Sequence, residues 1–567
     1  MTATPGRASA LVLAVDVGST SARAGVFDLQ GQMLASASAP FEVHRPMPDH
    51  AEHDSGQIWD AVGTAVRRAL ADCGRPAADV VGVGFDAATS LVLLDAAGAP
   101  VGVSCTGEDR WNVIMWADHR ATAQAQAVTA TGHGVLDYIG GVMSPEMQLP
   151  KLLWLKQQLP RAWERCALAL DLADFLSWKA TGQTVLSACT VTCKWTYLNH
   201  PAQSAPALAG TAQAQAHAKG AADGHAGAAA AAGWQQDFLA QVGLEDLVRK
   251  LRLPAQARPP GTPAAGLSDT TARDWGLTPG IPVAVSLIDA HAGALGVLGA
   301  IDPSEYDRQL ALIAGTSNCH MALSAQPRAI GGIWGPYFGA VLPDAWLNEG
   351  GQSASGALLD HVLDSHALGA SLGEHRHSRI SEYILRRRAE CGAGYASETL
   401  VVPDFHGNRS PLARPELRGI AWGLDLDGSI EGLARLYHAT AVGIAYGTRH
   451  IVDALNARGY RIDRLHLTGG HARSPLLVRL YADATDCTLV LPRESDGVLL
   501  GTALLAAAAA GAFPDLRSAG QAMVHQGASV TPDAQARALH ARGYAAFRLL
   551  LEQREQVLRV LQPVTPP

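Results

Sequence analysis

The chain has 567 residues, of which 48% are hydrophobic and 17% charged, so it is too long for one core and has an ordinary globular balance. Its net charge of −8 and the absence of a Lys/Arg-rich run argue against a nucleic-acid partner. No apolar run is long enough to cross a bilayer, and the 8 cysteines match no zinc-binding spacing, so we expect a cytoplasmic protein with reduced thiols and no membrane partner.

Apolar runs of strand length alternate with helical patterns in both halves of the chain, which predicts an α/β fold with helices packed against sheets. Residues 11–36 contain three such runs, with a turn at Gln30-Gly31, and we expect them to form a β-meander. This beginning argues against a plain doubly wound dinucleotide-binding fold. The expected strands include 11–16, 24–28, 80–85, 90–95, 309–314, 464–468 and 487–491.

Two stretches lack the pattern of a packed core. Residues 201–232 are of low complexity and hold almost no large apolar side chain, so we expect a flexible surface insertion that cannot offset its ordering entropy. Residues 364–378 contain three histidines, for which a solvated loop is favoured over a metal site: His366, His375 and His377.

The most informative feature is a short turn pattern that occurs twice. The apolar run 11–15 ends in Asp16-Val17-Gly18-Ser19-Thr20-Ser21, and the run 310–314 ends in Gly315-Thr316-Ser317-Asn318. Small residues in such turns let backbone N–H groups and hydroxyls approach phosphate oxygens closely. Either turn alone would be an ordinary β-turn, but the pair predicts that one polyphosphate is held from both sides.

Other motifs at strand ends refine this nucleotide-binding hypothesis. Asp16 beside the first turn suits Mg²⁺, held directly or through water, and a turn-capping role is equally compatible. No P-loop motif occurs, and the glycines of 82–87 are followed by another strand where a dinucleotide-binding motif requires a helix. Gly469-Gly470 would let the backbone lie flat against adenine, and Ser474 is expected to cap the next helix.

Charged residues within apolar segments are candidates for sugar recognition and catalysis. Asp289 follows an apolar strand and opens a small-residue helix, where an ionised carboxylate can act as a general base or serve only as a helix cap. Each of the other charged residues, taken alone, would belong to a structural ion pair. Together they could bind a polyhydroxylated ligand. They are Asp86, Asp118, Arg120, Lys194 and Glu349. Cys189 and Cys193 have no second pair nearby and are expected to be inert thiols.

By these residues the chain resembles the FGGY family of carbohydrate kinases from about residue 11 to 509. The family's two phosphate motifs are matched by 16–28 and 315–318, its adenosine motif by 467–474, and its two signatures by 143–155 and 439–455. Within the family the resemblance is closest to the ribulokinase-like pentulose kinases, which it follows at 82–95, 115–121, 193–195, 289–296 and 348–356.

The resemblance implies an α/β fold of two actin-like (ribonuclease H-like) domains, with ATP and sugar in the cleft between them. The N-terminal domain, with the sugar site and the first phosphate motif, would span 9–300, and the ATP-binding C-terminal domain 301–555. The family pattern also makes a homodimer plausible. The insertion 201–232 departs from the pattern in a surface region and affects no site residue.

The resemblance also assigns roles to individual residues. Asp289 would be the catalytic base, and Asp16 would position Mg²⁺. The sugar would be bound by Asp86, Ala87, Ala88, Asp118, Lys194, Asp289 and Glu349. ATP would be bound by Gly18, Ser19, Thr20, Ser21, Arg23, Gly315, Thr316, Ser317, Gly469, Gly470 and Ser474. Glycerol kinases carry an Arg-Glu pair at the level of 86–88, and its absence here counts against glycerol.

The sequence therefore predicts ATP-dependent phosphorylation of a ketopentose, with ribulose as the first choice, at its terminal hydroxyl. A kinase for xylulose or another polyol is the alternative within the same class. A non-catalytic actin-like ATP-binding protein is the alternative of a different class. No residue distinguishes D-ribulose from L-ribulose.

Overall fold

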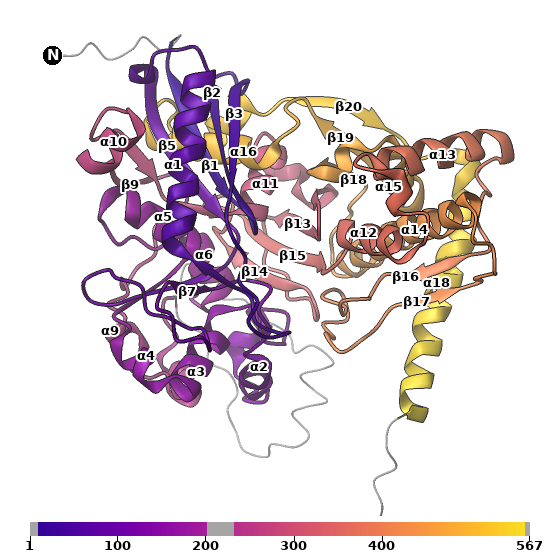
Figure 1. Cartoon of the computed structure of the whole chain (residues 1–567), viewed down its shortest axis with the longest axis horizontal. Coiled ribbons are helices and arrows are strands. Elements are labelled where there is room, and N and C mark those ends of the chain that lie inside the picture. The colour runs from indigo at the N-terminus through magenta and orange to yellow at the C-terminus, as the bar shows by residue number, and fades with distance from the viewer. Residues whose placement is uncertain (1–8, 201–231, 562–567) are drawn as a thin grey trace, which may run out of the picture. The chain divides into compact units, whose positions relative to one another are not determined.

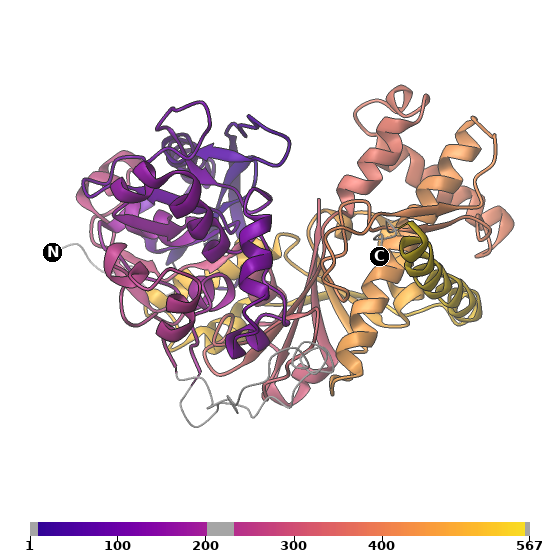
Figure 2. The same cartoon turned by 90° about the horizontal axis from the view of Figure 1, so that it is seen from below.

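The computed structural model describes residues 9–200 and 232–561, so nearly all of the predicted insertion 201–232 lies outside the described residues. The chain divides into two compact units (Figures 1 and 2). Unit 1 contains the chain up to Tyr306, Met321–Asn348 and Asp496–His525, and unit 2 contains Asp307–His320, Glu349–Ser495 and the chain from Gln526 onward. The assignment of kinase domains to 9–300 and 301–555 stays a prediction.

The main sheet of unit 1 begins with the predicted β-meander. Strands β1, β2 and β3 pair antiparallel, and β1 pairs in parallel with β5, in the order β3-β2-β1-β5-β10-β9 with β11 also on β5. Every residue of β1 is buried, as its continuous apolar run predicts. The strands are β1 (Leu11–Val17), β2 (Ser21–Asp28), β3 (Met33–Pro40), β5 (Val80–Ala87), β9 (Pro263–Gly266), β10 (Pro282–Ala284) and β11 (Leu287–Ile288).

Helices cover both faces of this sheet. Successive side chains of β5 point to opposite faces, so neighbouring residues of this strand contact different helices. Phe85 packs near Trp275 of α10 (Asp269–Trp275), which in turn packs near Trp59 of α1 (Ser55–Asp72). On the other face, a Cβ at Gly84 would lie only 2.4 Å from the Thr502 carbonyl oxygen, so glycine permits α16 (Gly497–Ala509) to pack directly on the sheet. Two further helices of unit 1 are α11 (Asp289–Leu298) and α17 (Leu516–Met523).

A smaller sheet in unit 1 has the order β4-β7-β6-β8, and all its pairs are antiparallel. Its strands are β4 (Glu52–Asp54), β6 (Leu91–Leu94), β7 (Trp111–Ile114) and β8 (Leu168–Asp171). The accompanying helices are α2 (Thr122–Thr129), α3 (Gln148–Gln158), α4 (Pro160–Arg165), α5 (Leu172–Thr181), α6 (Ala188–Lys194), α8 (Gln236–Gln241) and α9 (Leu247–Lys250).

The second large sheet has the order β14-β15-β13-β12-β18-β19-β20, and the division between the units falls within β13 and β15. Strands β12, β18 and β19 are parallel, as expected for an α/β unit. The strands are β12 (Gln309–Ala314), β13 (Asn318–Ser324), β14 (Trp334–Phe338), β15 (Trp346–Gln352), β18 (Arg464–Thr468), β19 (Thr488–Pro492) and β20 (Gln526–Val530). A separate antiparallel pair consists of β16 (Leu400–Val402) and β17 (Ile420–Trp422).

The helices of unit 2 include the long, amphipathic α14 (Ile430–Asn456), whose N-cap Ser429 accepts hydrogen bonds from the N–H groups of Glu431 and Gly432. The others are α12 (Gly356–Ser365), α13 (Arg376–Cys391), α15 (Pro475–Thr485) and α18 (Ala534–Leu561), which is labelled in Figure 1. None of the helices in the described part of the chain is both long enough and apolar enough to span a membrane.

The histidine-rich stretch 364–378 is more ordered than a solvated loop. The helix α13 already begins at Arg376, and the ring of His377 lies 2.9 Å from both Tyr437 Oη and Asp360 Oδ1. Within the described residues, these histidines belong to no cluster of potential metal ligands. The solvated-loop prediction is therefore wrong for its C-terminal end, because local composition did not reveal the partner side chains on other helices.

Candidate active site

The first predicted phosphate turn connects β1 to β2 in unit 1. Gly18 N–H donates to Ser21 carbonyl oxygen at 3.1 Å, and Thr20 at the tip is exposed. Trp116 Nε1 donates to Ser19 Oγ at 2.9 Å, which fixes the side of the turn. A Cβ added to Gly18 would meet a single atom, Ser21 O at 3.8 Å, so the backbone is open to a ligand. The turn thus has the accessible small residues that phosphate binding requires.

Arg23 joins two carboxylates beside this turn. Its Nε donates to Asp16 Oδ2 at 2.7 Å, and its Nη1 donates to Asp496 Oδ2 at 2.6 Å. Burial disfavours the charge of Arg23, but the carboxylates of Asp16 and Asp496 outweigh this effect and raise the pKa of Arg23 above its ordinary value. Arg23 therefore stays cationic beside the turn, as its predicted contact with phosphate requires.

Three aspartates gather at the carboxyl ends of neighbouring parallel strands. Asp16 of β1 lies opposite Asp86 of β5, and Asp86 lies opposite Leu287 of β11, two residues before Asp289. The fold thus explains how residues 16, 86 and 289 come together in unit 1, since parallel strands end at the same edge of a sheet.

Asp86 is the most deeply buried of the three. Thr502 of α16 donates a hydrogen bond from Oγ1 to Asp86 Oδ2. Burial, the carboxylate of Asp16 and, more weakly, that of Asp289 raise the pKa of Asp86 well above its ordinary value. The environment of Asp86 therefore favours the protonated form of this carboxyl group.

Asp289 is the first residue of α11 and remains partly exposed. Its Oδ1 accepts a hydrogen bond from the N–H of Ala290 at 2.6 Å, and the cap position itself is taken by Ile288, whose side chain makes no cap bond. A carboxylate at a helix N-terminus is stabilised in its ionised form. The predicted base thus lies at the edge of the sheet, and the backbone N–H of Ala290 holds one of its carboxylate oxygens in place.

Lys194 is the last residue of α6 and is only 3% exposed. Its Nζ lies 4.2 Å from the ring centroid of Trp334, a cation–π geometry. The buried carboxyl group of Asp171 lies near enough for Lys194 to lower its pKa, although burial dominates and raises that pKa to about 7. The ammonium group therefore has a fixed, desolvated position within unit 1.

A buried polar cluster holds α6 against the strand that leads to Asp289. Asp174 of α5 accepts hydrogen bonds from Thr190 Oγ1 at 2.6 Å, Ser286 Oγ at 3.0 Å and Ser187 N–H at 3.1 Å. Ser187 Oγ donates to the Ser286 carbonyl oxygen at 2.6 Å. The cluster fixes the position of Lys194 relative to Asp289, because these two residues end and begin the elements that it joins.

Asp118 has a structural ion pair. Both of its oxygens accept from Arg120, at 2.8 Å for Nε and 2.7 Å for Nη2, and Oδ2 also accepts from the N–H of Ala51 at 2.7 Å. Arg120 also donates to Glu52 Oε1 at 2.7 Å. These contacts shape the unit-1 core, whereas the sugar contact of Asp118 remains a prediction.

The other two residues predicted to bind sugar, Ala87 and Ala88, lie where the central strands end. Ala87 is the last residue of β5, and the N–H of Ala88 donates to the Val17 carbonyl oxygen at 2.9 Å.

The second predicted phosphate turn connects β12 to β13 in unit 2. Gly315 N–H donates to Ser317 carbonyl oxygen at 2.9 Å, and nothing lies within 4 Å of a Cβ at Gly315. The N–H groups of Ser355 and Gly356 donate to the carbonyl oxygens of Thr316 and Gly315, both at 3.0 Å. Ser355 Oγ donates to Asn318 Oδ1 at 2.8 Å. The turn is thus held rigidly and keeps an open side.

The predicted adenosine motif lies beside this second turn. Strand β18 pairs in parallel with β12, with Thr468 opposite Ile313, so the turns that follow both strands share one sheet edge. Gly469 has φ of +90°, and a Cβ there would lie 2.5 Å from the Ala314 carbonyl oxygen. Gly470 is open by contrast, with only that oxygen at 4.0 Å. Ser474 caps α15 by accepting from the Leu477 N–H, so its expected capping role is confirmed.

The structure therefore brings the predicted residues together within each unit. Unit 1 holds Asp16, the first turn, Arg23, Asp86, Lys194 and Asp289, and unit 2 holds the second turn, the glycine pair and Glu349, which is 4% exposed on β15. Three neighbours of these residues were not predicted: Asp496, Thr502 and Trp334. Asp496 could have been found in the sequence only as a charged residue just before an apolar helix. No local pattern indicates Thr502 or Trp334.

The sequence matches the FGGY family of carbohydrate kinases at residues 11–199 with its N-terminal domain and at 310–510 with its C-terminal domain. An FGGY carbohydrate kinase domain-containing protein of Homo sapiens is 40% identical, over 96% of this chain and 97% of that protein. A D-ribulokinase of Saccharomyces cerevisiae is 33% identical, over 88% of this chain and 72% of that protein. The crystal structure of a xylulose kinase from Rhodospirillum rubrum has a TM-score of 0.72 and 22% identity, over 97% of this chain and 100% of that one, which is a likeness of fold.

Proposed function

The chain belongs to the FGGY family of carbohydrate kinases, and from this premise we propose that it transfers the γ-phosphoryl group of ATP to the terminal hydroxyl of a ketopentose, with ribulose as its substrate. The fold is that of the family, two actin-like domains. The observation that carries the proposal is the convergence of Asp289, Asp86 and Asp16 at one sheet edge of unit 1, with a fixed ammonium group nearby.

The choice of ribulose rests on sequence similarity. The D-ribulokinase of Saccharomyces cerevisiae is 33% identical to this chain, and a ribulokinase of Geobacillus thermodenitrificans is 29% identical. The xylulose kinase from Rhodospirillum rubrum shares the fold at 22% identity, which is too low to transfer a substrate. A pentulose is thus the proposed class, and ribulose is the proposed member.

In the proposed mechanism, Asp289 accepts the proton of the attacking sugar hydroxyl. Its partly exposed carboxylate lies at the start of α11, where the helix N-terminus favours the ionised form, and its Oδ1 accepts a hydrogen bond from the N–H of Ala290. Lys194 binds a sugar oxygen as a charged donor, and the raised pKa of Asp86 favours a protonated group that does not repel an anionic phosphate. Glu349 of unit 2 is proposed to accept from sugar hydroxyls.

ATP is proposed to bind through both turns and the glycine pair. The backbone at Gly18, Gly315 and Gly470 is open where a Cβ would otherwise project, which fits close approach of phosphate oxygens and a planar base. Thr20, Ser21 and Arg23 of unit 1, with Thr316 and Ser317 of unit 2, would stabilise phosphoryl charge. Positioning and electrostatic stabilisation account for catalysis in such a transfer.

The residues beside the first turn fit a divalent cation in donor type. Carboxylate oxygens such as those of Asp16 are the ligands that Mg²⁺ prefers, and in kinases the ion usually keeps several waters and binds the phosphates. Asp16 is buried next to the turn, with its charge balanced by Arg23. Asp16 would hold Mg²⁺ directly or through water, and the ion would neutralise charge on the transferred group.

A coupled ADP-release assay on the purified chain tests the substrate. The panel contains D-ribulose, L-ribulose, D-xylulose, glycerol and a reaction without sugar. We expect kcat/KM to be highest for one of the two ribuloses and the rate without sugar to be far lower. A higher kcat/KM for xylulose or glycerol would contradict the choice of ribulose, and ATP binding without sugar-dependent turnover would favour a non-catalytic protein.

A further inference from the structure

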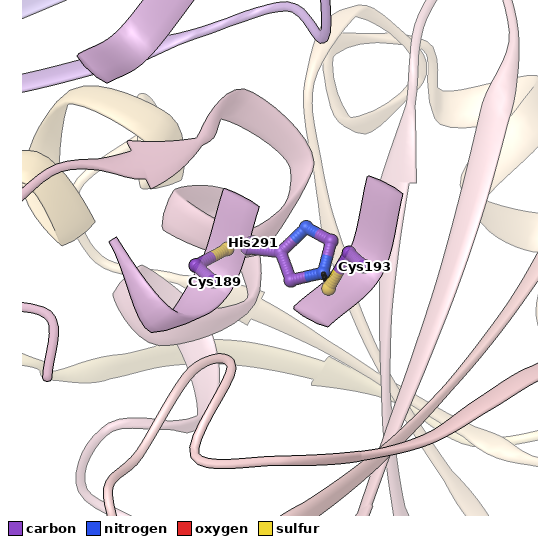
Figure 3. A group of neighbouring side chains, drawn as sticks. All are labelled: Cys189, Cys193 and His291. Carbon is purple, nitrogen blue, oxygen red and sulfur yellow. Dashed lines mark hydrogen bonds between the residues drawn. The ribbon is translucent and has the colours of Figure 1, made fainter. Parts of the chain in front are cut away.

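Two cysteines and a histidine converge in the core of unit 1, outside the residues assigned to ATP and sugar. Cys189 and Cys193 lie four residues apart on α6, and His291 is the third residue of α11. Their ligand atoms all lie within 4.8 Å of one another (Figure 3). It is the only such convergence of three or more His, Cys, Asp or Glu side chains in the described part of the chain.

We propose that Cys189, Cys193 and His291 form a binding site for a thiophilic metal ion, and that this ion is Zn²⁺. Two thiolates and an imidazole are a donor set that selects Zn²⁺ or Cu⁺ over Mg²⁺. Three protein ligands would leave the fourth tetrahedral position to a water molecule. The ligand set and its position differ entirely from those of Asp16, where a hard cation is expected.

The local geometry is compatible with tetrahedral coordination. Residues four apart on a helix share one face, so both thiols of α6 point the same way. The Sγ of Cys193 lies 3.3 Å from Nε2 of His291. Zinc bonds of about 2.3 Å to sulfur and about 2.0 Å to nitrogen place those two atoms roughly 3.5 Å apart in a tetrahedron. Only a small adjustment of the side chains would therefore admit the ion.

The surrounding structure fixes the two helices that carry these ligands. Asp174 binds Thr190 of α6 and Ser286 just before β11, which leads directly into α11. The three ligand side chains are themselves fully buried, at 0% exposure. A buried divalent cation needs compensating charge, and two thiolates provide it once their protons have left for solvent.

The site lies one residue from Lys194 and two residues from Asp289. A bound ion would join the end of α6 to the start of α11, and so fix or shift both side chains. If the proposed function is correct, Zn²⁺ should slow sugar phosphorylation in a way that a chelator reverses. The metal site itself stands independently of that function, because its test measures binding.

The experiment uses the full chain, kept reduced by a phosphine that binds zinc weakly. Competition with a chromophoric chelator gives the Zn²⁺ stoichiometry and affinity, and Co²⁺ reports on ligands through its sulfur-to-metal charge-transfer band. We expect one tightly bound ion per chain. Cys189→Ala, Cys193→Ala and His291→Gln should each weaken binding by more than the roughly 10–100-fold that loss of an outer-shell partner costs.

Cys166→Ala is the matched control, since Cys166 is another buried thiol of unit 1 outside the cluster. It should leave Zn²⁺ affinity and the cobalt band unchanged. Thermal melts without metal check that each variant is folded. Should a variant fail to fold, peptide mapping of the wild-type chain applies instead, where Zn²⁺ should protect Cys189 and Cys193 from alkylation during partial unfolding.

Absence of tight Zn²⁺ binding to the wild-type chain would overturn the proposal. So would an ion that binds equally well to all three variants, or zinc that leaves the alkylation of both cysteines unchanged. Zinc binding without any effect on turnover would leave the site in place and contradict only its link to catalysis.

Discussion

Asp86 and Asp289 have the same side chain and opposite environments. Asp86 is fully buried and receives a hydrogen bond from Thr502, and its pKa is raised chiefly by burial. Asp289 is partly exposed and lies at a helix N-terminus, which favours the ionised form. The two environments therefore push the proton affinities of these carboxyl groups apart, which is the pattern of carboxyl pairs with different roles in acid–base chemistry.

The proposed role of Asp289 as the base predicts the effect of Asp289→Asn. Loss of a general base typically costs about 10²–10⁴ in rate, so kcat should fall by that factor. The amide keeps the size and hydrogen-bonding capacity of the side chain, so calorimetry should show sugar binding within a few-fold of wild type. The exposed Asp60→Asn is the control and should keep full activity. A kcat near the wild-type value in Asp289→Asn would refute the assignment.

Lys194 should act mainly in binding. Lys194→Ala removes a charge-assisted hydrogen bond worth about 1.5–3 kcal/mol, which predicts a roughly 10- to 150-fold increase in the sugar KM and a smaller change in kcat. Lys179→Ala is a matched control, because Lys179 also faces an indole ring, at 6.0 Å from Trp178, but is exposed. An unchanged sugar KM in a folded Lys194→Ala enzyme would exclude the contact.

At the scale of elements, α11 and α16 cross at glycines, and this crossing positions Asp289. A Cβ at Gly296 would lie 1.9 Å from the Gly497 carbonyl oxygen, and one at Gly501 would lie 1.9 Å from that of Ala292. Neither contact can be tolerated, so both helices depend on glycine to approach each other. The same α16 delivers Thr502 to Asp86.

Gly501→Ala should therefore push the two helices apart. Overpacking of this kind costs about 1–3 kcal/mol, so thermal unfolding should occur at a lower Tm, and kcat should fall as the start of α11 moves. Gly134→Ala serves as the control, because nothing lies within 4 Å of a Cβ at Gly134. Equal Tm values for the two variants would show that the crossing is not tight.

Local patterns predicted the elements well and their long-range partners poorly. The meander at 11–36, the helix after Asp289 and the cap at Ser474 are all confirmed, because each depends on neighbours in sequence. The helix at Gly497–Ala509 packs on β1 and β5 from far along the chain, a contact that its local sequence does not indicate. Likewise, Cys189 and Cys193 gain His291 as a neighbour 98 residues beyond Cys193, which cysteine spacing cannot show.

For the residues of the candidate site, too, local sequence indicated single positions but not their long-range partners. Asp16, Asp86 and Asp289 were each found at a strand end by their local context, and parallel pairing then brought them to one edge. Trp334 below Lys194 and Thr502 beside Asp86 were missed, since an aromatic ring and a threonine in apolar segments carry no functional signal. The fold alone supplies these partners.

At the scale of the whole molecule, buried neutral histidines should make stability depend on pH. Burial lowers the pKa of eight histidines among the described residues: His53, His291, His320, His438, His450, His466, His471 and His540. Below pH 6.5, the ordinary pKa of histidine, these side chains bind protons in the unfolded chain but stay unprotonated in the folded state. Stability is therefore lost as pH falls from about 6.5 towards about 4.

Six aspartates act in the opposite sense. Burial raises the pKa of Asp171 to about 7 and that of Asp174 to about 8, so acidification from pH 8 stabilises the fold through them. Burial also raises the pKa of Asp86, Asp137, Asp404 and Asp483, which adds to the same effect. Because the histidines outnumber them, we expect Tm to fall between pH 6.5 and 4. His540→Gln should make this decline shallower, and a Tm that rises over this range would contradict the prediction.

The central claim is phosphoryl transfer to a terminal sugar hydroxyl with Asp289 as the base. The most direct measurement is ³¹P and ¹H NMR of the product from ATP, Mg²⁺ and ribulose, with wild type and Asp289→Asn compared at equal concentration. The account predicts a phosphate ester coupled to the methylene protons of the terminal carbon, formed far more slowly by the variant. ADP and inorganic phosphate without a sugar ester, or an ester formed equally fast by Asp289→Asn, would contradict it.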